Sequence, residues 1–451
     1  MNLFFISMGC AKNSVDSEHL IGLLKRAGHK IVDDSKDARG VIINTCGFIQ
    51  DAVKENIDAI LDLELMKERG DIEKIIVTGC LVNRHELELR KELPSVDLFA
   101  KAEEWDKILL FLDEGLGKTS LRAASNCDIR GMLPGSKFWS RYLKVGEGCD
   151  TRCSYCTIPL LRGRLRSVPI PQLVAEASML FRAGAKEICL VGQDLTAYGR
   201  DIYEDGAIEK LIISLGEVLP DDVWIRLLYL HPDRVTRKFL DFLSEQKKVV
   251  PYLDIPIQHI DDDILFAMNR TKASKHIRDI ITHARAVNPD FALRTTIMVG
   301  FPGETEEQFE SVLDFLSDTK LDRVGAFIYS PEEGTKAAFL PQLPDEVKES
   351  RYRRLMEFQS AISASRNARF VGKTLRVLTE EIDSSDSSAW GRSYRDAPEV
   401  DGMVQIEKIS RNCALGSFID VKITDSAEYD LFGVPKAHGH GRPQVAPTTK
   451  E

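Results

Sequence analysis

The sequence predicts an α/β protein of three parts: an N-terminal open, mostly parallel α/β sheet, a central partial barrel of six β/α units, and a small C-terminal antiparallel β-barrel. In the first two parts, short apolar runs alternate with amphipathic stretches of helical period, which is typical of parallel α/β folds. From residue 372, short apolar strands are separated by clusters of Gly, Ser and Asp, which favours an antiparallel sheet. The length of 451 residues is enough for two to four domains.

The first part is predicted to span residues 1–130 as an N-terminal α/β domain. The stretches at 16–27 and 51–67 have helical periodicity and separate apolar runs that are predicted to be buried strands, at 3–8, 41–45, 74–78 and 96–100. The first residues, MNLFFISMG, fit a strand better than a signal peptide, because the apolar run is short and no basic leader precedes it.

A connector containing Gly, Pro and Ser at 128–140 leads to the central part, which is predicted to span 135–370. Six strands are expected, with amphipathic helices between them, at 142–145, 187–191, 224–230, 252–257, 292–299 and 324–329. Six β/α units are too few to close an eight-stranded barrel. We therefore expect a barrel that is open at its side and admits a large substrate.

A charged helix at 345–369 is predicted to lead out of the barrel into the third part, 371–435. That part is expected to form a small antiparallel barrel with strands at 374–378, 403–406 and 418–423. The last residues, 436–451, are polar and rich in Pro and Gly, and are predicted to be disordered.

The composition bears on compartment and partner. No apolar run has the length of a membrane span, and nine scattered Cys, an odd number, argue for a reducing compartment, so a cytoplasmic location is expected. The net charge of -10 lacks the basic footprint of a dedicated nucleic-acid binder. RNA is therefore the less favoured partner, and a basic protein is the more favoured one.

The most specific motif is a CxxxCxxC loop formed by Cys149, Cys153 and Cys156. This spacing lets one loop wrap three thiolates around a 4Fe-4S cluster and leaves the fourth iron open for chemistry. A zinc site needs four ligands, and no fourth Cys or His is near in sequence. A simple electron carrier would also close its cluster with four Cys.

A second set of three Cys falls in the first domain, at Cys10, Cys46 and Cys80. Each follows a predicted strand and precedes a predicted helix, and parallel strands end at the same edge of a sheet. We predict that the three thiols share that edge and hold a second 4Fe-4S cluster with an open iron. The alternative is that each is a small buried residue in a tight turn. Packing is the prediction for the other three, Cys127, Cys189 and Cys413.

Active residues of β/α barrels lie at the C-terminal ends of strands. The candidates there are Gln193, Asp194, Arg226, Tyr229, Gln258, His259, Arg294, and the residues Gly300, Gly303 and Glu304 of one Gly-rich turn. Each either contacts a cofactor or caps a helix or holds a loop. The basic run at 161–167 either meets a carboxylate or forms a solvated surface.

The CxxxCxxC loop, with the aromatic Tyr155 before its last Cys, closely resembles that of radical S-adenosylmethionine (SAM) enzymes. The resemblance implies that the amino and carboxylate groups of SAM chelate the open iron and that one electron splits SAM into methionine and a deoxyadenosyl radical. It also implies that the segments 191–194 and 300–304, together with Tyr155, line the SAM site.

A three-Cys domain before a radical SAM domain resembles the methylthiotransferases. The segments 9–18 (GCAKNSVDSE) and 44–49 (NTCGFI) are similar to the RimO branch, whereas the tRNA-modifying MiaB branch has Gln-Met-Asn at Ala11-Lys12-Asn13 and Ser-Val at Gly47-Phe48. The third part resembles a TRAM domain, which binds RNA in many relatives. Acids outnumber bases between residues 371 and 435, however, and this charge fits RNA phosphates poorly.

The RimO resemblance implies a radical SAM methylthiotransferase that adds a methylthio group to the β carbon of an aspartate in a small-subunit ribosomal protein. Cys149, Cys153 and Cys156 would hold the radical-generating cluster, and Cys10, Cys46 and Cys80 the cluster that carries the sulfur. One SAM would supply the methyl group and another the radical, with an external electron donor. The sequence does not reveal the sulfur donor.

Two alternatives stay open at this point. One is methylthiolation of a tRNA adenosine, which requires the acidic third part to bind RNA. The other is a non-catalytic iron-sulfur electron carrier or redox sensor, which would not cleave SAM.

Overall fold

The structure, a computed structural model, describes residues 1–113 and 130–436. The chain divides into two compact units, Met1–Ser363 and Ala364–Glu451. The predictions for Cys127 and for the tail beyond residue 436 lie outside the described residues. None of the described helices combines the length and the apolar character needed to cross a membrane.

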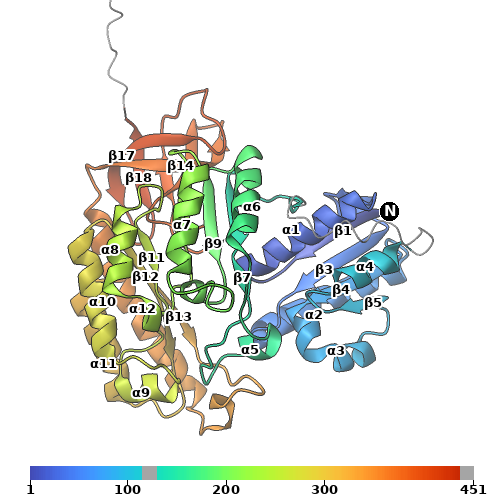
Figure 1. Ribbon diagram of the computed structural model, residues 1–451, viewed down its shortest axis with the longest axis horizontal. Helices are drawn as coiled ribbons and strands as arrows, with labels where there is room; N and C mark the ends of the chain where they lie inside the picture. Colours follow the sequence, from blue (N-terminus) through green and yellow to red (C-terminus); the bar gives the residue numbers. More distant parts are fainter. Residues whose placement is uncertain (114–129, 437–451) are drawn as a thin grey trace, which may run out of the picture. The chain divides into compact units, whose positions relative to one another are not determined.

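The first unit begins with a five-stranded parallel sheet of order β2-β1-β3-β4-β5 (Figure 1). Its strands are β1 (Asn2–Ser7), β2 (Lys30–Val32), β3 (Gly40–Thr45), β4 (Lys74–Gly79) and β5 (Leu98–Ala100). The segments between and after them form α1 (Ala11–Arg26), η1 (Ser35–Asp37), α2 (Gln50–Glu68), α3 (Cys80–Glu92) and α4 (Trp105–Leu112). Because successive strand residues point to opposite faces, this sheet buries apolar side chains on both. Ile42 and Ile76 join the core shared with α1 and α4, whereas Val41 and Val77 join the core shared with α2 and α3.

The central domain is an open, curved arrangement of six parallel strands in two three-stranded sheets. One sheet has the order β10-β9-β6 and the other β11-β12-β13, and a parallel bridge from Ile225 to Val249 connects the β10 side to the chain entering β11. The strands are β6 (Ser140–Lys144), β9 (Glu187–Val191), β10 (Trp224–Leu227), β11 (Tyr252–Asp254), β12 (Ala292–Val299) and β13 (Arg323–Ile328). The predicted partial barrel of six β/α units is confirmed.

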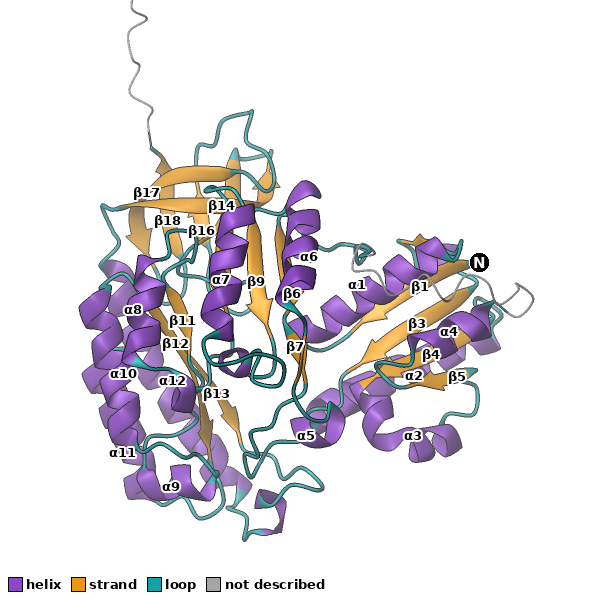
Figure 2. Ribbon diagram, in the orientation of Figure 1, coloured by secondary structure: helices purple, strands orange, loops and turns teal. Residues whose placement is uncertain are grey.

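Helices cover one face of these strands and share a single large apolar core with them. Figure 2 shows β9, β11, β12 and β13 in orange with the helices α7, α8 and α10 beside them. The helices are α5 (Ile158–Leu161), α6 (Ile170–Arg182), α7 (Ala207–Val218), α8 (Arg237–Glu245), α9 (Asp262–Ala267), α10 (Ser274–Val287) and α11 (Glu306–Thr319). Short elements complete the domain: β7 (Gly146–Glu147), β8 (Arg166–Ser167), η3 (Leu195–Ala197), η4 (Pro232–Arg234) and η5 (Ala337–Phe339). The helices do not take up the loops at the carboxyl ends of the strands, so these loops are available to form a site.

The helix α12 (Asp345–Ala368) leads into the second unit, a closed five-stranded barrel of order β14-β15-β16-β18-β17. The strands are β14 (Thr374–Asp383), β15 (Ser388–Ser393), β16 (Val404–Ile406), β17 (Phe418–Ser426) and β18 (Leu431–Pro435). The small barrel is confirmed, with two additions to its predicted strands. β15 was missed because its sequence, SAWGRS, has no regular apolar alternation, and β18 pairs with β16 in parallel rather than antiparallel.

Candidate active site

Three thiols of the N-terminal domain lie at the carboxyl ends of adjacent strands. Cys10 caps the start of α1 after β1, Cys46 follows β3, and Cys80 opens α3 directly after β4. The Asn13 side-chain amide ties the loops together by donating to the carbonyl oxygens of Met8 (3.1 Å) and Thr45 (3.0 Å). The turns need glycine: a Cβ at Gly9 (φ +95°) would lie 2.8 Å from the Cys46 Cβ. The sheet order thus brings the three predicted thiols to one edge.

The CxxxCxxC loop follows the short strand β7 and is held by backbone contacts. Ser154 donates from its hydroxyl to the Ala267 carbonyl (2.7 Å) and from its amide to the Met268 carbonyl (3.1 Å). Gly148, directly before Cys149, has φ +76°, and a Cβ there would lie 2.1 Å from the Arg164 carbonyl oxygen. A rigid loop of this kind presents its thiols in fixed positions.

Burial shifts the pKa of one thiol in each set upward. Burial raises the pKa of Cys156 to about 12, and the neighbouring Cys153 and Cys149 thiolates add to that rise. Burial likewise raises the pKa of Cys80 to about 11, against the opposing charge of Arg162. Such thiols keep their protons until a metal replaces them. In the described residues, no three His, Cys, Asp or Glu side chains lie close enough together to hold a single metal ion.

Both sets of thiols open onto one cavity of about 380 Å³. Cys10 and Cys80 line it from the N-terminal domain, and the three Cys of the loop line it from the central domain. Cys46 does not line it, although its Sγ would lie 3.2 Å from a Cβ at Gly9, next to Cys10. The remaining wall is made by Lys12, Phe48, Thr151, Tyr155, Ile158, Leu161, Arg162, Gln193, Asp194, Tyr229, His231, Pro256, Gln258 and Arg270.

The cavity wall offers polar atoms that have no partner in the protein. Gln193 Oε1, Gln258 Oε1 and Arg270 Nε are buried without a hydrogen bond, and all three side chains line the cavity. Gln258 (φ 70°) and Tyr229 (φ 64°) also hold left-handed backbone conformations, which are costly for these residue types and cluster at functional sites. A polar ligand such as SAM fits this wall, because buried polar groups require partners.

Four of the predicted cofactor contacts, Tyr155, Gln193, Asp194 and Gln258, line the cavity, and six do not. Arg226 is fully buried and pairs with Glu187 (2.7 Å) between β10 and β9, and Arg294 pairs with Asp254 (2.7 Å). Gly300, Gly303 and Glu304 belong to the turn after β12, where the Glu304 carboxylate accepts from the Gly300 amide (2.5 Å) and meets Nε2 of His259, which follows β11 (3.2 Å). Cofactor contact by these six stays a prediction that the lining of the cavity does not support, because a strand end fixes where a residue lies but not which way its side chain points.

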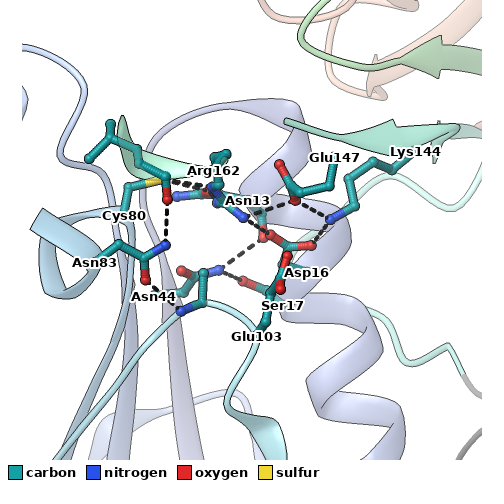
Figure 3. Close-up of polar contacts among 12 residues, drawn as sticks. Asn13, Asp16, Ser17, Asn44, Cys80, Asn83, Glu103, Lys144, Glu147 and Arg162 are labelled. Carbon is teal, nitrogen blue, oxygen red and sulfur yellow. Dashed lines mark hydrogen bonds and ion pairs between the residues drawn. The ribbon is translucent and has the colours of Figure 1, made fainter. Parts of the chain in front are cut away.

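One buried guanidinium joins the two halves of the cavity. Arg162, from the end of α5, donates to Cys80 Sγ (3.1 Å), to the Asn13 side-chain oxygen (2.5 Å), and to the carboxylates of Asp16 (2.9 Å) and Glu147 (3.0 Å) (Figure 3). Lys144 pairs with the same two carboxylates. Two cations and two anions therefore balance one another across the contact between the N-terminal domain and the barrel.

Electrostatics keep the Glu147 carboxylate charged. Burial would raise the pKa of Glu147, but Lys144 and Arg162 lower it to about 2. The basic run at 161–167 divides accordingly: Arg162 is buried against carboxylates, whereas Arg164 is solvated and pairs with the partly exposed Asp150. Of the two interpretations predicted for this run, contact with a carboxylate holds for Arg162 and a solvated surface holds for Arg164.

Sequence reasoning missed the cavity residues Lys12, Thr151, His231 and Arg270. Arg270 lies in the connection between α9 and α10 rather than at a strand end, and Lys12 lies inside α1. In the sequence, Lys12 is a charged residue two positions after a Cys, and Arg270 is a charged residue in a short connection. Such residues are too common to be singled out.

Comparison with known proteins gives a consistent result along the chain. Residues 2–101 match the model of Uncharacterized protein family UPF0004, residues 143–316 that of the Radical SAM superfamily, and residues 371–435 that of the TRAM domain. The ribosomal protein uS12 methylthiotransferase RimO of Geobacter sulfurreducens is 42% identical over 436 residues, which cover 95% of this chain and 97% of that protein. The protein of the same name from Thermoanaerobacter sp. is 41% identical over 440 residues, which cover 96% and 99%.

Solved structures share the fold. The radical SAM methyltransferase TsrM from Kitasatospora setae, with cobalamin and a 4Fe-4S cluster bound, has a TM-score of 0.54 at 13% identity and covers 75% of this chain and 74% of its own. The cobalamin-dependent SAM radical enzyme OxsB has a TM-score of 0.51 at 13% identity, with 80% of this chain and 56% of its own covered.

Proposed function

Because this chain belongs to the RimO family of radical SAM methylthiotransferases, we propose that it adds a methylthio group to ribosomal protein uS12, on the β carbon of an aspartate. The observation that carries the proposal is the single cavity lined by Cys of both sets. Hydrogen removal and sulfur delivery must act on the same carbon. The groups that carry them out therefore need to face one cavity.

We assign the six Cys as ligands of two 4Fe-4S clusters, with Cys149, Cys153 and Cys156 on the one beside Tyr155, and Cys10, Cys46 and Cys80 on the other. When bound, the first cluster with SAM supplies a radical that removes hydrogen from an unactivated carbon, and the second supplies the sulfur. The protein's own contribution is to hold the thiols at fixed loops, to pack Tyr155 beside the first set, and to enclose the cavity. A side-chain base could not do this work, because it must match the acidity of the group it deprotonates.

Arg270 is proposed to hold the SAM carboxylate. Its guanidinium donates to the Tyr155 hydroxyl (2.8 Å) and to His231 Nε2 (2.7 Å). Burial, and then the charges of Arg270 and Arg234, lower the pKa of His231 to about 2, so His231 is neutral and does not balance the charge of Arg270. No carboxylate of the described residues lies within ion-pair distance of this buried cation, and a carboxylate ligand beside the loop of the first cluster would supply the missing charge.

Replacing Arg270 by Met is expected to weaken SAM binding by about 10- to 100-fold, because a hydrogen bond to a charged group contributes about 1.5–3 kcal/mol. Equilibrium dialysis of radiolabelled SAM against the cluster-loaded protein measures the change. Arg278→Met is the matched control, since Arg278 lies on α10 and pairs with Asp318 at the surface. Equal SAM affinity in the Arg270 variant and the wild type would remove Arg270 from the cofactor site.

The C-terminal barrel is proposed to meet a basic protein rather than RNA. Two of its basic residues, Arg392 and Arg395, are buried, and Arg392 pairs with the buried Glu380 (2.7 Å). The exposed acids of the barrel outnumber its exposed bases; the acids are Glu381, Asp383, Asp386, Glu399, Glu407, Asp420, Asp425 and Glu428, and the bases are Lys373, Arg376, Lys408, Arg411 and Lys422. This surface charge attracts a basic ribosomal protein and repels phosphates.

The proposed function is tested with purified components. The reconstituted protein is mixed with SAM, a reductant, uS12 and tRNA in one reaction, and both polymers are then examined by mass spectrometry. We expect the methylthio mass increment on uS12 alone and deoxyadenosine among the products. An increment on tRNA would favour the tRNA-modifying alternative, and no SAM cleavage would favour an electron carrier or sensor.

A further inference from the structure

Lys12 is a buried cation on the cavity wall that the proposed chemistry does not yet use. It lies in the first turn of α1, two residues after Cys10, and is only 9% exposed. Its Nζ lies 3.7 Å from the centre of the Tyr229 ring, which belongs to the central domain. The side chain therefore reaches from the N-terminal domain to the barrel, on the wall of the cavity that thiols of both sets line.

Arg162 on the cavity wall, and the nearby cations Lys144 and Arg234 outside that wall, have carboxylate partners. Arg162 and Lys144 share Asp16 and Glu147, and Arg234 pairs with Asp194 (2.5 Å). Lys12 has no carboxylate within ion-pair distance among the described residues, and its close contact is an uncharged aromatic face. A cation–π contact contributes about 0.5–2 kcal/mol, which is less than the several kcal/mol that burial of an ammonium costs. A carboxylate that enters the cavity would supply the ion-pair partner that Lys12 lacks among the described residues.

The backbone of Tyr229, whose ring faces the Lys12 ammonium, is held in place. Tyr229 holds a left-handed backbone (φ 64°), and its amide donates to the Asp254 carboxylate (2.9 Å). Asp254 is in turn paired with Arg294 (2.7 Å). An ammonium that is held against a fixed ring is pre-organised, so little entropy is lost when it binds a ligand.

The proposed function brings two organic carboxylates into the cavity, that of SAM and that of the target aspartate. Arg270 lies against Tyr155 in the loop of the first cluster, whereas Lys12 lies beside Cys10 of the second set. We propose that Lys12 binds the carboxylate of the target aspartate side chain and so selects an acidic residue as substrate. The inference rests on the proposed function and deepens it, because the β carbon is directly bonded to the carboxylate that Lys12 would hold.

The test measures binding without turnover. The cluster-loaded protein, with no reductant present, is titrated with a fluorescent uS12 peptide that carries the target aspartate, and with the same peptide carrying Asn there. We expect the wild type to bind the Asp peptide about 10- to 100-fold more tightly, the range for a hydrogen bond to a charged group. The Lys12→Met variant should bind both peptides with the weaker affinity, while Lys12→Arg should keep part of the preference for Asp.

Lys25→Met is the matched control, because Lys25 is an exposed residue near the end of the same helix α1. It should bind both peptides like the wild type. Iron and sulfide content should be the same in the wild type, Lys12→Met and Lys25→Met. These readouts separate loss of substrate recognition from loss of a cluster.

Three results would overturn the inference. The preference for the Asp peptide could survive in Lys12→Met. The variant could instead lose iron or change the electron paramagnetic resonance signal of the second cluster while keeping that preference, which would make Lys12 a counter-charge of the cluster. A wild type that binds neither peptide and leaves uS12 unmodified would mark a failure of the proposed function itself.

A second measurement uses the wild-type protein alone, so it does not depend on whether a variant folds. A carbodiimide joins an amine directly to a carboxylate, so treatment of the wild-type complex with the Asp peptide should link Lys12 to the aspartate. Tryptic mass spectrometry identifies the linked lysine. A link from the aspartate to other lysines, and none to Lys12, would contradict the inference.

Discussion

Replacing Cys10, Cys46 and Cys80 together by Ala is expected to abolish methylthio transfer to uS12 while SAM cleavage continues. The three thiols lie on the edge of the N-terminal sheet, separate from the loop that holds the other set. Iron should fall from about eight to about four atoms per chain, since one of two 4Fe-4S clusters loses its ligands. Transfer should fall by at least about 1,000-fold, because sulfur delivery has no substitute in the cavity.

The complementary variant carries Ala at Cys149, Cys153 and Cys156. It should also bind about four irons, but it should neither cleave SAM nor modify uS12. Cys413→Ala is the control, because Cys413 lies in the C-terminal barrel and should leave iron content and transfer unchanged. If the first triple variant still transferred methylthio groups, the N-terminal thiols would have no role in sulfur delivery.

The second large effect is expected at Arg162. Replacement by Met leaves the buried carboxylates of Asp16 and Glu147 with Lys144 as their one direct cation among the described residues, and it removes the donor to Cys80. Breaking a buried ion pair by removing one partner costs about 3–5 kcal/mol. Because these groups join the N-terminal domain to the barrel, we expect a markedly lower urea midpoint for the first unit, measured by circular dichroism on the metal-free protein.

Arg164→Met is the matched control for that measurement. Arg164 lies two residues further along the chain, but its side chain is 88% exposed and its partner Asp150 is partly exposed. Exposed ion pairs are screened by water and salt. The control should unfold at the wild-type midpoint, and equal midpoints for the two variants would show that the buried network does not hold the domains together.

The grouping of the thiols could be predicted from the sequence because it depends on local spacing and on strand order. Cys149, Cys153 and Cys156 lie within one loop, so their grouping does not depend on the rest of the fold. Cys10, Cys46 and Cys80 required one further step, the rule that parallel strands end at a common edge, and the order β1-β3-β4 follows that rule.

The residues that line the cavity were harder to predict than the thiols, because lining depends on side-chain direction. Arg226 and Arg294 lie on predicted strands, yet each pairs with an acid of a neighbouring strand and lies off the cavity. Arg270 reaches the cavity from a connection between helices, and no periodic pattern marks such a residue. The start of α1 was also placed too late, since its first turn carries polar residues that are buried against the site rather than solvated.

The most direct measurement is the mass of uS12 and of the tRNA nucleosides from cells that lack this gene, before and after the gene is restored. The methylthio increment should be absent from uS12 in the deletion and should return, on the aspartate peptide, with the wild-type gene but not with the Cys10, Cys46 and Cys80 variant. The tRNA nucleosides should be the same in all strains. An increment that returned on tRNA, or an unmodified uS12 in the restored strain, would contradict the assignment.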